Sequence, residues 1–212
     1  MKITKFGHCC LLIEESNSRI ITDPGSWNDI PVLSAIDAIL ISHEHADHIH
    51  VESVKKILLL NKDAVVYTHE GVKKLLDAGN IPCTIVKDGE QFWVKGVSVS
   101  SFGTEHACIH HDIPIVQNTG FYIANKFFYP GDSFHNPNKE IQILALPVIA
   151  PWMKIEEAIE YAKVIKPKVV FPVHDGMLRE DRRSFTRMIP KMLLEKEKIE
   201  FVDIVEGAAV TF

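Results

Sequence analysis

Short apolar segments separated by turn-forming residues dominate the first third of the chain. Residues 3–6, 9–13 and 19–22 are apolar or β-branched, and residues 15–18 carry Glu, Ser, Asn and Ser. Segments of this kind, bounded by turn residues, predict strands. Residues 38–41 form a continuous apolar run, which is typical of a strand covered on both faces. We therefore expect an N-terminal region rich in β-structure.

Apolar residues recur at helical spacing further along the chain. They predict helices that begin near Val51 and that cover residues 70–78 and 155–165. Gly79 and Pro167 supply the stop signals for the last two of these helices.

The segments between the predicted helices favour strands. Residues 65–68 and 83–129 have this pattern, with a hairpin expected over residues 119–129. Residues 141–146 and 168–173 are also expected to be strands, on either side of a helix. The last third of the chain therefore alternates strand and helix.

The C-terminal pattern predicts one more helix and a pair of strands. The helix should cover residues 181–196, and Pro190 should kink or split it. Residues 201–205 and 208–212 should pair with each other around Gly207. Periodicity alone does not decide between an α/β and an α+β fold.

The length and composition are those of an ordinary globular protein. A chain of 212 residues with 46% hydrophobic and 24% charged residues fits one domain over residues 1–212. No apolar run approaches the roughly 20 residues of a membrane span, and the apolar stretch over residues 9–13 is too short for a signal-peptide core. We therefore expect a cytoplasmic protein that does not bind membranes.

Charge and cysteine spacing narrow the expected partners. The net charge of −5 argues against a broad nucleic-acid surface, so a small-molecule substrate is expected. None of the four cysteines belongs to a pair with two-residue spacing, which argues against a structural zinc ribbon. The sequence leaves a homo-oligomer open.

The most informative chemistry lies in residues 43–48, which have the sequence HEHADH. Imidazole nitrogen and carboxylate oxygen are the ligands that zinc and similar divalent metals take in open, catalytic sites. A solvated polar loop is the alternative interpretation, but clustered His and Asp favour a metal site.

The spacing within this run limits the geometry. The zinc-binding helix motif with two His four residues apart is absent, because Asp47 lies four residues after His43. Alternate positions of an extended segment point the same way, so His43 and His45 could reach one metal together. Asp47 and His48 could serve a second metal only if the chain bends there.

The run resembles the His-x-His-x-Asp-His signature of the metallo-β-lactamase superfamily. In that family the first two His bind one metal, and the Asp and last His bind its neighbour; the remaining ligands are a His, a bridging Asp and a final His from later loops. The chain offers a candidate for each in the right order, just past an apolar run: His106, Asp132 and His174. The resemblance thus implies a first metal on His43, His45 and His106, and a second on Asp47, His48 and His174, with Asp132 bridging.

The resemblance also implies an αββα sandwich of two mixed sheets with helices outside. Within the superfamily, the chain looks most like the small, stand-alone branch that includes ascorbate-6-phosphate lactonase. Three short motifs carry this narrower similarity: Gly-His-Cys-Cys at residues 7–10, Ile-Thr-Asp-Pro at 21–24 and Pro-Gly-Asp-Ser at 130–133.

Two divalent ions in such a site sit about 3.5–4 Å apart and lower the pKa of a water between them towards ~7. The resulting hydroxide would attack a carbonyl or phosphorus centre, with Asp47 and Asp132 at the catalytic centre. Imidazole at position 45 favours Zn²⁺ and leaves Mn²⁺ or Fe²⁺ open.

Four other His are candidates for the pocket. His110 and His111 lie in an irregular stretch, where one could protonate a leaving group and where solvated loop residues are equally expected. His8 and His135 could line the pocket.

The leading functional hypothesis is a metal-dependent hydrolase acting on a small-molecule lactone, another ester or a phosphoester. A phosphodiesterase or nuclease of the same fold is the first alternative. A non-catalytic metal-binding scaffold is the second, although the complete ligand set argues against it.

Overall fold

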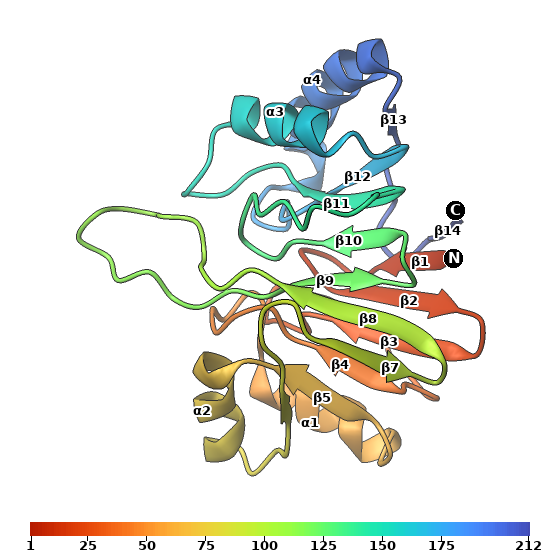
Figure 1. The fold of residues 1–212 in the computed structure, drawn as a ribbon, viewed down its shortest axis with the longest axis vertical. Coiled ribbons are helices and arrows are strands. Elements are labelled where there is room, and N and C mark those ends of the chain that lie inside the picture. The colour runs from red at the N-terminus through yellow and green to blue at the C-terminus, as the bar shows by residue number, and fades with distance from the viewer.

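The computed structural model describes residues 1–212, apart from the side chain of Glu180, and contains two seven-stranded sheets that pack face to face (Figure 1). The first sheet has the strand order β14-β1-β2-β3-β4-β5-β6. It is antiparallel from β14 to β3 and parallel from β3 to β6. Its strands are β1 (Lys2–Lys5), β2 (Leu11–Glu15), β3 (Ser18–Thr22), β4 (Ala38–Leu40), β5 (Val65–Thr68), β6 (Thr84–Ile85) and β14 (Ala209–Thr211).

The second sheet repeats this design, with the order β13-β12-β11-β10-β9-β8-β7. It is antiparallel from β7 to β10 and parallel from β10 to β13. Both sheets are therefore mixed, as the resemblance implied. The strands are β7 (Gln91–Val94), β8 (Val97–Phe102), β9 (Gly120–Ile123), β10 (Phe127–Tyr129), β11 (Ile143–Pro147), β12 (Val169–Val173) and β13 (Glu200–Phe201).

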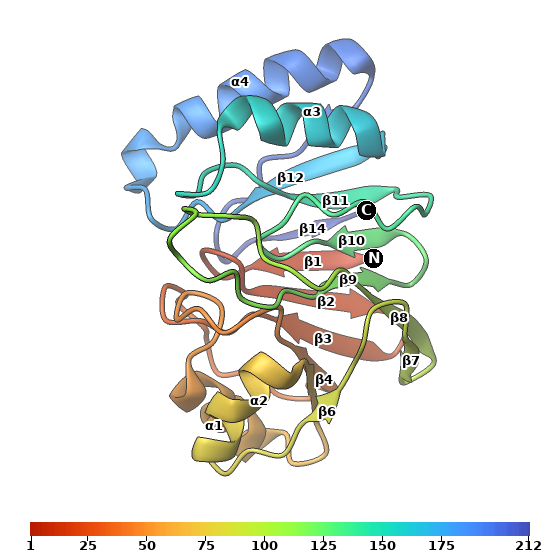
Figure 2. The same cartoon turned by 60° about the vertical axis from the view of Figure 1, so that its left-hand side comes forward.

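Four α-helices cover the outer faces of the two sheets. The first sheet packs against α1 (Val51–Leu60) and α2 (Glu70–Ala78), and the second against α3 (Ile155–Ile165) and α4 (Ser184–Leu194). The two pairs lie at opposite ends of the view in Figure 1 and again in Figure 2. Two short 3₁₀ turns, Glu180–Arg182 and Glu195–Glu197, flank α4. The arrangement confirms the predicted αββα sandwich.

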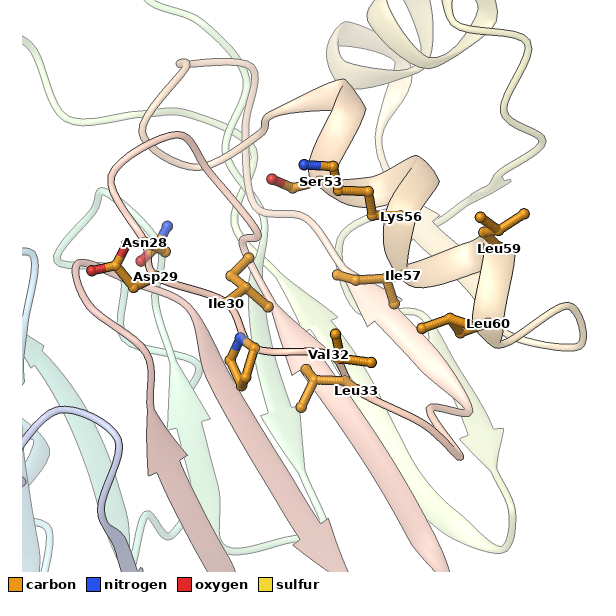
Figure 3. A pocket seen from close by; sticks show the side chains of 11 residues that line it. Asn28, Asp29, Ile30, Val32, Leu33, Ser53, Lys56, Ile57, Leu59 and Leu60 are labelled. Atoms are coloured by element: carbon orange, nitrogen blue, oxygen red, sulfur yellow. The ribbon is translucent and has the colours of Figure 1, made fainter.

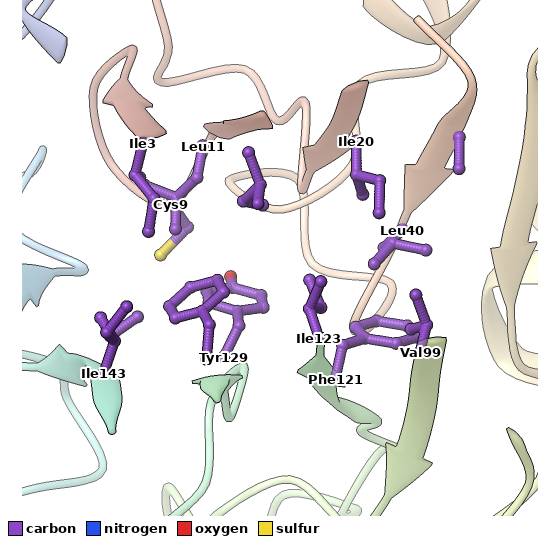
Figure 4. Close-up of a cluster of buried hydrophobic side chains, with 14 of the residues drawn as sticks. Ile3, Cys9, Leu11, Ile20, Leu40, Val99, Phe121, Ile123, Tyr129 and Ile143 are labelled. Carbon is purple, nitrogen blue, oxygen red and sulfur yellow. The ribbon is translucent and has the colours of Figure 1, made fainter. Parts of the chain in front are cut away.

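The main core lies between the two sheets. Figure 4 shows Ile3, Leu11 and Leu40 of the first sheet facing Phe121 and Tyr129 of the second. Successive strand residues point to opposite faces, which is why the runs in both sheets are apolar on both sides. Burial of each such side chain contributes about 1.5–3 kcal/mol, so this layer holds the two sheets together.

The C-terminal strands differ from the prediction. Residues 201–205 and 208–212 do not pair with each other, because β13 extends the second sheet beside β12 while β14 extends the first sheet beside β1. The chain crosses from one sheet to the other between them. Each short segment gains more by completing an open sheet edge than by forming an isolated hairpin, which is marginally stable in water.

The helix before these strands also differs from the prediction. Helix α4 covers Ser184–Leu194 instead of residues 181–196 and continues through Pro190, so of the two predicted effects of this proline the split does not occur. Proline removes one helical hydrogen bond. Pro190 and Leu194 are both buried, so packing of the inner face keeps the helix in one piece.

The loops that leave the strands at one end of the sandwich connect the two sheets. The backbone N–H of Thr119 donates to the carbonyl of Ser42 over 2.9 Å, and that of His174 donates to the carbonyl of His8, also over 2.9 Å. The polar residues singled out in the sequence follow β4, β8, β10 and β12, so they gather at this end. In the part of the chain that the structure describes, no helix has the length and apolar character needed to cross a membrane.

Candidate metal centre

The His-rich run forms a tight turn directly after β4. The backbone N–H groups of His48 and Ile49 both donate to the carbonyl of His45, at 2.9 Å each. The chain therefore bends at Asp47 and His48, which is the condition under which these two residues could serve a second metal. Gly25 packs against the outside of this turn, and a Cβ atom there would lie 1.8 Å from the carbonyl oxygen of Asp47.

His43, His45 and His106 form the first cluster, with candidate donor atoms that all lie within 4.8 Å of one another. His43 Nε2 lies 3.0 Å from His45 Nδ1. The Ser42 hydroxyl donates to Asp23 over 2.5 Å, so at His43 it accepts, and Nδ1 of His43 must donate over 3.0 Å. A neutral His43 ring therefore turns its Nε2 lone pair towards His45.

Asp47, His48 and His174 form the second cluster, and His8 joins them within the same 4.8 Å limit. The Nε2 atoms of His48 and His174 each lie 3.8 Å from Asp47 Oδ2. His8 Nε2 approaches the same oxygen to 3.2 Å. The structure thus brings together the three residues expected at a second metal and adds the His8 ring, which is completely buried.

Asp132 lies between the two clusters. Its Oδ1 atom is 3.2 Å from His48 Nε2, and its Oδ2 atom is 2.8 Å from His174 Nε2 and 3.4 Å from His106 Nε2. The side chain of Asn118 holds the turn, because it donates to the Pro130 carbonyl over 2.9 Å and accepts from the Asp132 N–H over 3.0 Å.

In three histidines of the clusters, the Nδ1 atom faces away from the centre and contacts a backbone or side-chain oxygen acceptor. Nδ1 of His106 donates to the Ala107 carbonyl over 2.6 Å, and Nδ1 of His174 donates to the Ile149 carbonyl over 2.7 Å. Nδ1 of His48 contacts Asp23 Oδ2 at 2.6 Å. These contacts set the tautomer that leaves each Nε2 lone pair facing inward, which is how outer partners orient metal-binding imidazoles.

Two supporting residues could not be assigned from the sequence. Asp23 is completely buried and accepts from the backbone N–H of Ser42 over 2.7 Å, from His48 and from the Tyr129 hydroxyl. Trp152 donates its indole N–H to Asp132 Oδ2 over 2.9 Å. The sequence placed Asp23 in the Ile-Thr-Asp-Pro motif of the narrower resemblance, but gave it no role at the site. Trp152 carried no signal beyond an aromatic side chain near a loop.

A buried ion pair holds the loop that carries His174. The next residue, Asp175, is fully buried and lies 2.5 Å from the ammonium of Lys5, which is also fully buried. Arg187 approaches the other carboxylate oxygen to 2.9 Å. Burial alone would raise the pKa of Asp175, but Lys5 and Arg187 lower it below its usual value. The loop is therefore anchored to both β1 and α4.

The electrostatics favour anionic carboxylates in the centre. Burial would raise the pKa of Asp47, but the contact with His8 and the charge of His48 lower it to about 2. Burial would likewise raise the pKa of Asp132, which the neighbouring His48 and His174 hold well below its usual value. Burial and the nearby His48 lower the pKa of His43 well below its usual range, so its imidazole is neutral at neutral pH. The carboxylates act on His48 in the opposite direction: burial would lower its pKa, but Asp132 and Asp23 raise it well above its usual value, so a bound ion would have to replace a proton on this ring. Anionic oxygen beside neutral imidazole is the donor chemistry of divalent transition metals.

The donor atoms also fit such metals in number and spacing. Nε2 of His8, His48, His106 and His174 and Oδ1 of Asp132 are among the buried polar atoms without a hydrogen-bond partner. Each such atom costs about 1–3 kcal/mol unless something binds it. Two ligands on one tetrahedral zinc, each about 2.0–2.1 Å from the ion, are about 3.3 Å apart. The contacts of Asp132 with His48, His174 and His106, at 3.2, 2.8 and 3.4 Å, are close to that spacing.

The remaining predicted residues lie outside both clusters. His110 and His111 form a separate, exposed group with Asp112 on the loop between β8 and β9, which projects to the left in Figure 1. His135 is half-buried and packs beside Gly103. A hollow of about 650 Å³ lies between residues 28–33 and α1 (Figure 3), and none of the residues that line it belongs to either cluster.

Comparison with known proteins assigns the family. A family model described as a beta-lactamase superfamily domain matches residues 2–174, which is most of the chain. Together with the αββα fold and the two His/Asp clusters, this match shows that the chain belongs to the metallo-β-lactamase superfamily.

Individual relatives agree with this assignment. Protein Rv0786c of Mycobacterium tuberculosis is 32% identical over 218 residues, a match that covers 100% of both chains. The metal-dependent hydrolase MJ1163 of Methanocaldococcus jannaschii is 24% identical, over 81% of this chain and 83% of its own. Igni18, a metallo hydrolase from Ignicoccus hospitalis, superposes with a TM-score of 0.73 at 18% identity, over 100% of this chain and 98% of its own. At 18% identity, the similarity to Igni18 shows only a shared fold.

Proposed function

We propose that the chain is a dinuclear metal-dependent hydrolase that cleaves a lactone, another ester or a phosphoester in a small molecule. Membership of the superfamily and the hydrolase names of relatives support the general class. The observation that carries the dinuclear assignment is the position of Asp132, which contacts an inward-facing imidazole nitrogen of each cluster.

The proposal divides the ligands between the two clusters in the way that the resemblance implies. His43, His45 and His106 would hold the first ion, and Asp47, His48 and His174 the second, with Asp132 shared. The imidazole-rich donor set favours Zn²⁺, with Mn²⁺ and Fe²⁺ as the alternatives.

When bound, such ions supply an activated water at neutral pH and stabilise the negative charge that develops on the attacked oxygen. The residues of the chain hold this arrangement in place. The two carboxylates balance the positive charge, and the outer contacts of His48, His106 and His174 keep their rings oriented. We retain His110 and His111 as candidates for protonating the leaving group, since their loop follows His106 directly.

The narrower resemblance to the ascorbate-6-phosphate lactonase branch is part of the proposal. It rests on the short motifs around His8, Asp23 and Asp132, all of which are buried at the clusters or beside them. Lactones are therefore the first substrates to test.

The deciding experiment is metal analysis of protein purified without chelator, combined with hydrolysis assays on lactones and on a generic phosphodiester. We expect about two ions per chain and hydrolysis of at least one ester class. Asp132→Ala should lower the metal content and abolish turnover in a soluble, folded protein. Asp63→Ala removes an exposed carboxylate that belongs to no His/Asp group and should leave both unchanged.

Other outcomes would favour the alternatives. Cleavage of oligonucleotides with no turnover of small esters would indicate a nuclease. Bound metal without hydrolysis of any ester class would indicate a scaffold protein. Full activity of Asp132→Ala would remove this residue from the site.

A further inference from the structure

His8 lies inside the second cluster and looks, by residue type alone, like a fourth ligand. It follows β1, its ring is completely buried, and its donor atom lies within 4.8 Å of those of Asp47, His48 and His174. Its ring centroid is 4.0 Å from that of His174. The direction of its hydrogen bonds, however, separates it from the other histidines.

The backbone N–H of Gly176 donates to Nδ1 of His8 over 3.0 Å. A backbone N–H can only donate, so Nδ1 must keep its lone pair and the ring proton must be on Nε2. The contacts of His48, His106 and His174 run the other way, because in each of them Nδ1 faces an oxygen acceptor. Those three rings present a lone pair to the centre, whereas His8 presents an N–H group.

The carboxylate oxygen within reach of that N–H group is Asp47 Oδ2, at 3.2 Å, although the N–H is not aligned with this oxygen and Nε2 has no hydrogen-bond partner in this structure. We infer that His8 is not a metal ligand but the positioning residue that donates a hydrogen bond to the carboxylate of Asp47. This inference rests on the proposed function, since Asp47 is a proposed ligand of the second ion. By engaging Oδ2, His8 fixes the carboxylate plane and leaves Oδ1 free of that hydrogen bond.

The main chain around His8 supports this role. A Cβ atom on Gly176 would lie 2.8 Å from the Cβ of His8, so the backbone can approach the ring closely only because residue 176 is glycine. The carbonyl of His8 accepts from the N–H of His174 over 2.9 Å. His8 thus contacts two proposed ligands of the second ion, Asp47 through its ring and His174 through its backbone.

Two substitutions distinguish a hydrogen-bond donor at position 8 from a metal ligand there. In His8→Gln the amide nitrogen can take the place of Nε2 and still donate to Asp47, whereas His8→Ala removes the donor. We expect chelator competition with Zn²⁺ to show that His8→Ala weakens binding of one of the two ions about 10–100-fold, and that His8→Gln restores most of this loss. Equal losses in the two variants would contradict the inference. His50→Ala removes an exposed histidine at the start of α1 and serves as the control.

Nuclear magnetic resonance tests the assignment without any activity measurement. Protein labelled with ¹⁵N-histidine is loaded with ¹¹³Cd²⁺, which couples to ligating imidazole nitrogens. We expect couplings at His43, His45, His48, His106 and His174, and at His8 a proton on Nε2 with no coupling. A cadmium coupling at His8, or a proton on its Nδ1, would overturn the inference while the proposed function stands. Failure of the wild-type protein to bind any ion would instead overturn the proposed function, and the inference with it.

Discussion

Gly25 lies against the peptide that joins Asp47 to His48, so closely that an added Cβ atom would sit 2.6 Å from the backbone nitrogen of His48. The metal-binding turn therefore depends on a residue that carries no donor atom. Gly25→Ala should push this turn outward and separate Asp47 from His174.

We expect Gly25→Ala to lose one or both ions and to lower the free energy of unfolding by about 3 kcal/mol. Metal analysis and urea unfolding measure the two effects. Gly96→Ala is the control, because a Cβ atom there has nothing within 4 Å and only its positive φ of 84° opposes the change. That control should keep its full metal content, and normal metal content in Gly25→Ala would show that the turn tolerates the displacement.

Asn118 determines where Asp132 sits. Its side chain makes one hydrogen bond to the Pro130 carbonyl and one to the Asp132 N–H. Asn118→Ala leaves the buried Asp132 N–H unpaired and the Pro130 carbonyl with only the Ser133 hydroxyl, at 3.3 Å, so we expect a loss of about 1–3 kcal/mol in the free energy of unfolding and a lower metal content. The exposed Asn17→Ala, at a position without a positive φ, should change neither. Unfolding curves and metal analysis on the same preparations would reveal whether Asn118 acts on the site or only on stability.

The buried pair of Lys5 and Asp175 should respond unequally to removal of either partner. Asp175→Asn removes the negative charge beside the buried Lys5 ammonium and leaves it only neutral oxygens, such as the Pro172 carbonyl at 3.0 Å, so we expect a cost of about 3–5 kcal/mol. Lys5→Met costs less, because Arg187 still neutralises Asp175. Lys2→Met on the same strand breaks an exposed pair with Glu14 and should cost at most about 1 kcal/mol. Chemical denaturation ranks the three variants, and a larger loss for Lys5→Met than for Asp175→Asn would contradict this account.

His110 and His111 provide a test of the leaving-group step. Both are exposed and lie outside the two clusters, so His110→Ala and His111→Ala should retain all bound metal. If one of them donates the proton, its loss should lower kcat about 10²–10⁴-fold with little change in KM. Substrates with better leaving groups should show a smaller effect. Unchanged rates in both variants would show that the two histidines are solvated loop residues without a role in the reaction.

The sequence predicted those features that a short segment determines by itself. The HEHADH run, the apolar strands and the helix over residues 155–165 depend on local periodicity and residue chemistry, and the two-sheet sandwich followed from the family resemblance. The strands that pair with β13 and with β14 could not be predicted, because both segments are short and their partners lie far away in the chain.

For a related reason, the contacts that support the proposed ligands could not be predicted from the sequence. Trp152 reaches Asp132 across 20 residues, and His48 reaches Asp23 across 25. An indole or a turn aspartate has more common uses in packing and in turns, so the motif around Asp23 indicated a family branch but not this contact, and nothing local singled out Trp152. His8 could be named as a pocket residue, but its hydrogen-bond direction depends on Gly176, which lies 168 positions away.

The proposed ligands come from both sheets, since His43 to His48 follow β4 while His106, Asp132 and His174 follow strands of the other sheet. Ions bound by both groups would link the two sheets to each other. Because ions that bind only the folded chain would stabilise it, their loss would lower the free energy of unfolding while the apolar core still holds the sheets together, and metal starvation of a cell would shorten the lifetime of this protein.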